Sequence, residues 1–136
     1  MRENALVPGM DVLHNAMWVS DIEETLEFYT EALDLEKTRE FESGDGARNV
    51  YVAGESDTEI QFKYHPDHDV PEQHGDGYDH VAIAVDDTDA EVERLVEETG
   101  CTVRRGPLTS DGANARVCFI EDPDGYGIEL VEEFDD

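Results

Sequence analysis

Two stretches of the sequence read alike: HNAMWVSDIEETLEF, from His14 to Phe28, and HVAIAVDDTDAEVER, from His80 to Arg94. Each begins with a histidine, continues with a short apolar run, and reaches acidic residues just before apolar residues recur at helical spacing. The two histidines stand 66 positions apart, about half of the 136-residue chain, which indicates an internal duplication. We therefore expect each half to begin with a strand that leads into a helix.

The two predicted helices have matching ends. Ser20 with Glu23, and Thr88 with Glu91, have the spacing of a capping box at a helix start, and Gly100 is the expected end of the second helix. Short strand-like segments bounded by glycines follow each helix. We place them at residues 37–42, 47–53 and 58–64 in the first half, and at 101–105, 115–120 and 127–132 in the second.

This order of elements predicts an α+β fold, in which a single domain over residues 1–136 consists of two tandem βαβββ modules. The first module covers residues 10–64 and the second covers residues 78–134. Residues 65–77, which are rich in His, Asp, Pro and Gly, form the predicted linker.

The charge of the chain limits its partners. It has 36 acidic and 9 basic residues, and its net charge of −27 repels nucleic acid and anionic membranes, so we expect neither as a partner. The acidic residues are spread through amphipathic elements, as on the surfaces of proteins from extreme halophiles. The chain shows neither a signal peptide nor an apolar run of the roughly 20 residues that cross a bilayer, so we expect a soluble, cytoplasmic protein.

The duplication also pairs candidate site residues. When the last strand of the first half, TEIQFKY, is set beside that of the second half, GIELVEE, Glu59 becomes the equivalent of Glu129. Side chains alternate across a strand, so Ile128 and Leu130 take the core side and leave Glu129 on the other side. Two pairs of equivalent residues result, which are His14 with His80 and Glu59 with Glu129.

These four residues have the chemistry of a metal site. An unpaired carboxylate inside a protein is costly, so it takes a partner, a metal or a proton. Two imidazoles and two carboxylates suit a divalent ion such as Zn²⁺ or Ni²⁺, and a set without thiolate leaves room for substrate oxygens, as in catalytic sites. Gln61 shares a strand face with Glu59 and remains the alternative second ligand.

Three segments resemble the signatures of the glyoxalase I (lactoylglutathione lyase) family, of the short bacterial type in the vicinal oxygen chelate superfamily. They are HNAMWVSDIEETLEFYTEALDL from His14, GYDHVAIAVDD from Gly77 and FIEDPDGYGIELVEE from Phe119. The resemblance implies an open, barrel-like metal cleft with one divalent ion per site, Ni²⁺ or Zn²⁺ with Co²⁺ and Mn²⁺ as alternatives. The implied metal ligands are again His14, Glu59, His80 and Glu129.

The resemblance also implies a homodimer whose sites are shared between chains, although a site within one chain would use the same residues. The implied reaction converts the hemithioacetal of methylglyoxal and a thiol into a lactoyl thioester, which detoxifies methylglyoxal. In this reaction Glu129 is the implied base and Glu59 the second acid or base. Trp18 and Lys63 replace an arginine and an asparagine of the family's glutathione site, so these two are the predicted substrate-binding residues, and γ-glutamylcysteine is an alternative thiol to glutathione.

Three other functions remain open on the same scaffold. An acyl-CoA epimerase gains support if Gln61 is the second ligand, and a ring-cleaving dioxygenase would use His14, His80 and Glu129 to hold iron. The third alternative is a non-catalytic module that binds a small molecule.

Overall fold

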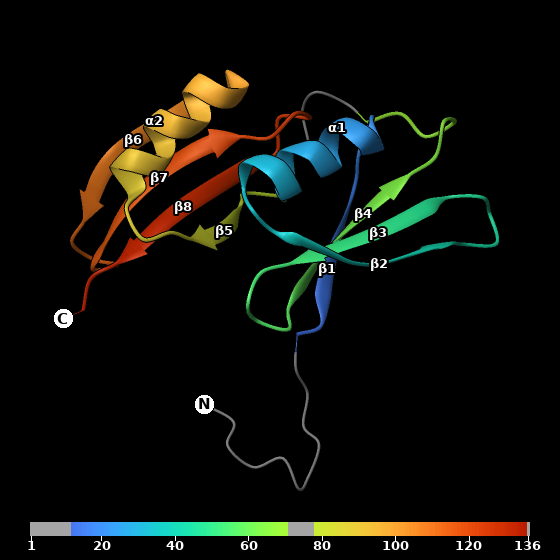
Figure 1. Cartoon of the computed structure of the whole chain (residues 1–136), viewed down its shortest axis with the longest axis horizontal. Coiled ribbons are helices and arrows are strands. Elements are labelled where there is room, and N and C mark those ends of the chain that lie inside the picture. Colours follow the sequence, from blue (N-terminus) through green and yellow to red (C-terminus); the bar gives the residue numbers. More distant parts are fainter. Residues whose placement is uncertain (1–11, 71–77, 136) are drawn as a thin grey trace, which may run out of the picture.

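The fold consists of two four-stranded sheets and two helical segments (Figure 1). The computed structural model describes residues 12–70 and 78–135, so the start of the first predicted module and most of the predicted linker lie outside the described residues. The first sheet contains β1 (His14–Trp18), β2 (Glu36–Glu42), β3 (Arg48–Ala53) and β4 (Glu59–Tyr64), and the second contains β5 (Val81–Ala84), β6 (Val103–Ser110), β7 (Ala115–Glu121) and β8 (Gly127–Glu133). The helical segments are α1 (Ile22–Leu26), which continues as the π-helix η1 (Glu27–Ala32), and α2 (Thr88–Thr99).

Both sheets have the same topology. The strand orders are β1-β4-β3-β2 and β5-β8-β7-β6, and in each sheet the first strand pairs in parallel with the last. The remaining pairs are antiparallel. This repetition confirms the predicted α+β fold of two tandem βαβββ units. The two sheets do not close into one barrel, and Figure 1 shows them on opposite sides of the view with α1 between them.

The helix starts differ from the prediction by one residue. Asp21 caps α1, where its Oδ1 accepts a hydrogen bond from the backbone N–H of Glu24 at 3.0 Å. Asp87 caps α2 in the same way. The capping boxes predicted at Ser20 and Thr88 are therefore wrong. Asp21 follows Ser20 and Asp87 precedes Thr88, and each aspartate takes the cap position because its side chain accepts the backbone hydrogen bond and its negative charge favours the helix N-terminus. Gly100 ends α2 at a φ of 71°, as predicted.

Alternation along the strands separates a core face from a second face in each sheet. Ile60 and Phe62 of β4, like Ile128 and Leu130 of β8, are buried in the core beneath the helices. Gln61 and Glu129 lie between these buried residues, and they point with Glu59 to the other face of their sheets. Among the described residues, no helix is long and apolar enough to span a membrane.

A buried hydrogen-bond network joins the two halves. The Tyr29 hydroxyl of η1 donates to Asp122 Oδ2 at 2.8 Å, and Asp122 Oδ1 accepts from the backbone N–H groups of Asp124 and Tyr126. The Tyr126 hydroxyl donates to the carbonyl oxygen of Trp18, at the end of β1. Burial raises the pKa of the Asp122 carboxyl and, together with the nearby Asp122 charge, raises the pKa of Tyr29 well above its ordinary value. The β7–β8 turn is thereby fixed against the first half.

We predict that Tyr29→Phe destabilises the fold by about 1.5–3 kcal/mol, because a buried carboxylate loses its hydroxyl donor. The free energy of unfolding, measured by denaturant titration at constant salt, tests this expectation. Tyr64→Phe is the control, since the Tyr64 side chain is partly buried and its hydroxyl makes no hydrogen bond to the described residues. Equal losses in the two variants would contradict the prediction.

Candidate metal centre

The first pair of predicted ligands lies on neighbouring strands. His14 of β1 stands directly opposite Glu59 of β4 in the parallel register, so both side chains share one face. The Glu59 carboxylate accepts from Thr38 Oγ1 at 2.5 Å and from Arg39 Nη2 at 3.2 Å. These contacts, the Thr38 hydrogen bond foremost, hold the pKa of Glu59 below its ordinary value. The His14 ring packs edge-on against Tyr51.

The second pair is in direct contact. His80 Nε2 lies 3.1 Å from Glu129 Oε1, while His80 Nδ1 lies 2.6 Å from Asp79 Oδ2. The imidazole also packs edge-on against Phe119, with ring centroids 5.4 Å apart. The Glu129 side chain is 18% exposed, so one end of this pair remains open to solvent.

The contacts of His80 fit a bound cation. A neutral imidazole donates from only one of its two nitrogens, yet both nitrogens of His80 face carboxylate oxygens. Both contacts are attractive only when a cation, either a second proton or a metal ion, lies on the Nε2 side. Asp79 fixes the ring through Nδ1, as carboxylates commonly do for histidines that bind metal. Nε2 and Glu129 Oε1 are the two atoms of this pair that could hold a divalent ion.

The structure brings each pair together but keeps the two pairs on separate sheets. Within residues 12–70 and 78–135 of one chain, no group of three or more His, Cys, Asp or Glu side chains is close enough to hold a metal ion. These two faces do not meet within the described part of one chain. A site with all four ligands would therefore require the His14–Glu59 face of one chain to meet the His80–Glu129 face of another.

The alternative ligand Gln61 stands opposite Ala16 as Glu129 stands opposite Ala82, so the two occupy equivalent register positions. The Gln61 side chain is buried, and its Nε2 donates to Asn49 Oδ1 at 2.8 Å. Lys63 Nζ donates to the same oxygen at 2.8 Å and lies 5.2 Å from the centroid of the Trp18 ring. His68 stacks on Trp18 with ring centroids 3.7 Å apart. The two predicted substrate-binding residues, Trp18 and Lys63, are thus neighbours at the far end of the face that carries His14 and Glu59.

Sequence reasoning missed the residues that support the ligands. Asp79 directly precedes His80, so the adjacency alone was a usable signal. Thr38 and Arg39 reach Glu59 because the register of β2 shifts between Lys37 and Arg39, and no sequence pattern marked that bulge.

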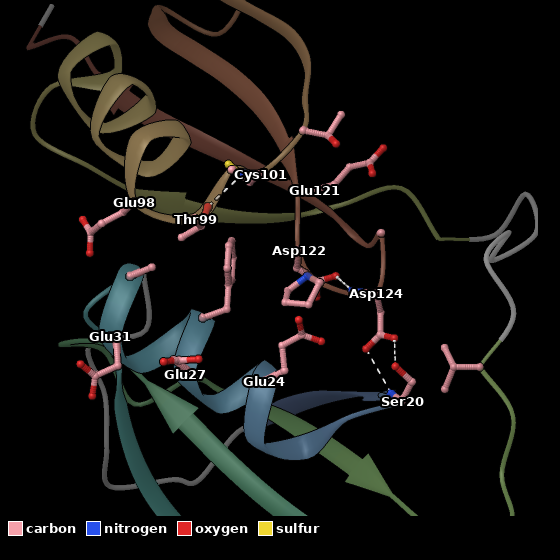
Figure 2. Close-up of a pocket in the computed structure, with 17 residues that line it drawn as sticks. Ser20, Glu24, Glu27, Glu31, Glu98, Thr99, Cys101, Glu121, Asp122 and Asp124 are labelled. Carbon is pink, nitrogen blue, oxygen red and sulfur yellow. Dashed lines mark hydrogen bonds between the residues drawn. The ribbon is translucent and has the colours of Figure 1, made fainter.

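A hollow between the halves is a poor site for this chemistry (Figure 2). It has a volume of about 820 Å³ and contains none of the four predicted ligands. Figure 2 shows Ser20 hydrogen-bonded to Asp124 at the edge of the hollow, with carboxylates around the hollow. The acidic residues that line it are Glu24, Glu27, Glu31, Glu98, Glu121, Asp122 and Asp124. Such a surface repels anionic ligands.

Comparison with known proteins identifies the family. The model of the Glyoxalase/Bleomycin resistance protein/Dioxygenase superfamily matches residues 11–130. The chain belongs to the glyoxalase superfamily. A lactoylglutathione lyase from Haemophilus influenzae is 35% identical over 127 residues, which cover 90% of this chain and 93% of that protein. Such relatives show that the chain is a glyoxalase I-like lyase of the bacterial type, as the sequence resemblance implied.

Solved structures of the glyoxalase superfamily include both an enzyme and a binding protein. Glyoxalase I from Zea mays matches with a TM-score of 0.73 at 25% identity, over 91% of this chain and 45% of that one. TnmS3, an antibiotic binding protein from Streptomyces sp. CB03234, matches with a TM-score of 0.71 at 27% identity, over 92% of this chain and 97% of that one. The glyoxalase I relatives support a divalent metal in general terms.

We predict that Asp79→Asn weakens divalent-metal binding by about 10- to 100-fold, because the asparagine no longer fixes the His80 ring with a charged acceptor. Titration with Co²⁺, followed by visible absorbance, measures the change. Asp86→Asn removes the same charge from an exposed residue that contacts no predicted ligand, and it should bind Co²⁺ like the unmodified protein. Equal affinities in all three proteins would show that Asp79 has no role in the site.

Proposed function

We propose that this protein converts the hemithioacetal of methylglyoxal and a low-molecular-weight thiol, glutathione or γ-glutamylcysteine, into a lactoyl thioester. The observation that carries the proposal is that each of the two repeated sheets carries a histidine and a glutamate on one face. His14 with Glu59, and His80 with Glu129, occupy matching faces of two repeated sheets in a glyoxalase I-like chain. We further propose that the ion is Ni²⁺ or Zn²⁺ and that the protein acts in the cytoplasm at high salt.

The two carboxylates suit different tasks. Glu59 accepts hydrogen bonds at both oxygens, from Thr38 and Arg39, so it is held as a fixed anion. Glu129 faces His80 through Oε1, and its Oε2 accepts no hydrogen bond from the described residues. We assign to Glu129 the removal of the proton from one carbon of the substrate and its return to the adjacent carbon. A divalent metal, when bound, would stabilise the negative charge that develops on the substrate oxygens.

The site in this proposal is shared across a homodimer. β1 and β5 are the edge strands of their sheets, and they carry or adjoin the two histidines. An exposed edge strand is a ready surface for another chain. A second copy that places its His80 and Glu129 against His14 and Glu59 would complete four ligands, which one chain does not do.

Two observations bear on the alternatives. Gln61 donates to Asn49 through Nε2, which leaves its Oε1 able to bind a metal, so the ligand set of an epimerase stays an alternative. The similarity to the antibiotic binding protein TnmS3 supports a non-catalytic binding module as the second candidate.

The test of the proposed function is turnover. Methylglyoxal is mixed in molar KCl with each of several thiols and with Ni²⁺, Zn²⁺, Co²⁺ or Mn²⁺ in turn. Growth of thioester absorbance in the ultraviolet is the expected result. Absence of turnover with every thiol, in protein shown to be loaded with metal, would reject the proposal.

We predict that Glu129→Gln lowers kcat by about 10²- to 10⁴-fold, because an amide cannot carry the proton. Glu133→Gln changes an exposed residue of the same strand in the same way and should retain activity. A binding module would instead keep its affinity for a small ligand in both variants, which calorimetry with that ligand would reveal.

We also predict that two inactive variants complement each other. In a mixed dimer of His14→Ala and Glu129→Gln chains, one shared site carries both changes and the other carries neither. Random mixing should restore about a quarter of the unmodified activity, since half of the dimers are mixed and half of their sites are intact. Refolding the two chains together and assaying the mixture measures this recovery. A site built within one chain would give no recovery.

A further inference from the structure

A buried asparagine lies beside the candidate metal site. Asn49 of β3 is fully buried, and its side-chain oxygen Oδ1 accepts two hydrogen bonds at 2.8 Å, one from Gln61 Nε2 and one from Lys63 Nζ. Its side-chain nitrogen Nδ2 donates to the carbonyl oxygens of Ala47 at 3.1 Å and Phe41 at 3.5 Å. Neither the proposed reaction nor the four predicted ligands give this network a role.

The surroundings of Asn49 determine which way its amide points. A lysine ammonium only donates hydrogen bonds, so the atom of Asn49 that faces Lys63 must be the oxygen. A backbone carbonyl only accepts hydrogen bonds, so the atom that faces Ala47 must be the nitrogen. The two ends of the amide are thus assigned independently. Gln61 can therefore meet Asn49 Oδ1 only with its own NH2 group.

This contact leaves the Gln61 oxygen on the far side of its amide. β4 lies between β1 and β3, so a Gln61 amide whose nitrogen faces Asn49 on β3 directs its Oε1 away from β3. Gln61 is only 7% exposed, and its Oε1 accepts no hydrogen bond from residues 12–70 or 78–135. Buried polar atoms are normally paired, so an unpaired oxygen here points to a bound cation or donor.

The repeat relates Gln61 to the first histidine. In the second sheet Glu129 stands opposite the second residue after His80, and its Oε1 lies 3.1 Å from His80 Nε2. In the first sheet Gln61 stands opposite the second residue after His14. Gln61 therefore has the same place relative to His14 that Glu129 has relative to His80, with a neutral amide instead of a carboxylate.

An amide serves a metal only through its oxygen. The carbonyl oxygen of a glutamine is a ligand for divalent ions, whereas its NH2 group only donates hydrogen bonds. The two ends exchange places when the terminal torsion of the side chain turns by half a revolution, and that torsion has two wells of similar energy. The hydrogen bond from Gln61 Nε2 to Asn49 selects one of the two orientations.

We propose that Asn49 is a positioning residue of the metal site, which holds the Gln61 amide with its oxygen toward the ion and its nitrogen away from it. This inference rests on the divalent ion of the proposed function, and it adds Gln61 Oε1 to His14 as a donor from the first sheet. Asn49 contacts neither the ion nor the substrate. Because Asn49 acts through Gln61, its removal should weaken metal binding only while Gln61 is present.

The test is a double-mutant cycle in Co²⁺ affinity, measured by titration with visible absorbance. Asn49→Leu removes the acceptor at nearly constant side-chain volume, and Gln61→Met removes the amide. Each should weaken Co²⁺ binding by about tenfold or more, and the combined variant should bind no more weakly than Gln61→Met alone. Asn49→Asp is the matched control, because it keeps an oxygen beside Gln61 and Lys63, and its affinity should stay within about threefold of that of the unmodified protein.

Three results of the cycle would overturn the assignment. If Gln61→Met binds Co²⁺ like the unmodified protein, the Gln61 oxygen is not a ligand. If the losses of the two single variants add up in the combined variant, Asn49 acts through packing and not through Gln61. If Asn49→Asp loses as much affinity as Asn49→Leu, the acceptor oxygen is not the feature that matters.

A second measurement does not depend on the folding of any Asn49 variant. The chain has two glutamines, Gln61 and Gln73, so ¹⁵N in the glutamine side chains gives two NH2 groups to observe by NMR, and the one that Gln73→Met retains belongs to Gln61. The buried NH2 group of Gln61 should exchange slowly with solvent, and its nitrogen resonance should shift when Zn²⁺ binds Oε1. An unshifted resonance in protein loaded with Zn²⁺ would contradict the assignment.

The results also separate this inference from the proposed function. The expected cycle in Co²⁺ affinity, without turnover of any thiol, would support the role of Asn49 and reject the proposed function. Turnover of a thiol, together with a Gln61→Met protein that binds Co²⁺ normally, would reject the role of Asn49 and leave the proposed function standing.

Discussion

The parallel pairing of the first and last strands in each βαβββ unit is the constraint on which the candidate site depends. It sets His14 opposite Glu59 and brings His80 within 3.1 Å of Glu129. Because side chains alternate along a strand, a shift of one residue would set Ile60 beside His14 and turn Glu59 toward the core. The buried residues Ile60 and Phe62, and Ile128 and Leu130 in the second sheet, oppose such a shift, since the hydrophobic core fixes the register.

The contacts between the two halves extend this constraint to the substrate end of the first sheet. Tyr126 donates to the carbonyl oxygen of Trp18, and Tyr29 donates to the buried Asp122. The β7–β8 turn thus fixes the end of β1, four residues beyond His14. The halves share one hydrophobic core that includes residues of both helical segments, while the predicted ligands lie on the other face of each sheet. The same contacts that stabilise one chain therefore keep its two ligand pairs apart.

Much of this arrangement could be predicted from the sequence because a duplication supplies each signal twice. The two-fold βαβββ order follows from aligning the halves. The pairing of Glu59 with Glu129 does not, because Glu129 stands opposite Ala82 as Gln61 stands opposite Ala16, so the register makes Gln61 the equivalent of Glu129. The capping boxes were placed one residue off, since Ser20 and Thr88 are adjacent to aspartates that cap equally well, and their hydroxyls donate instead to Asp124 and to the carbonyl oxygen of Arg116. The partners of Glu59 were not predictable, because they depend on a bulge in β2 that has no sequence signature.

The two halves differ in the surroundings of Glu59 and Glu129, the carboxylates to which the proposed reaction gives different roles. If the two carboxylates across a metal had identical surroundings, they would be equally basic. Neither would then be preferred as the group that takes up the proton. Thr38 and Arg39 bind both oxygens of Glu59 and lower its pKa, which makes it a poor proton carrier. Arg105, which lies 66 positions after Arg39 and two strands from Glu129, forms no such pair. The two carboxylates thus differ in their partners, since Glu59 accepts from Thr38 and Arg39 while Glu129 contacts His80.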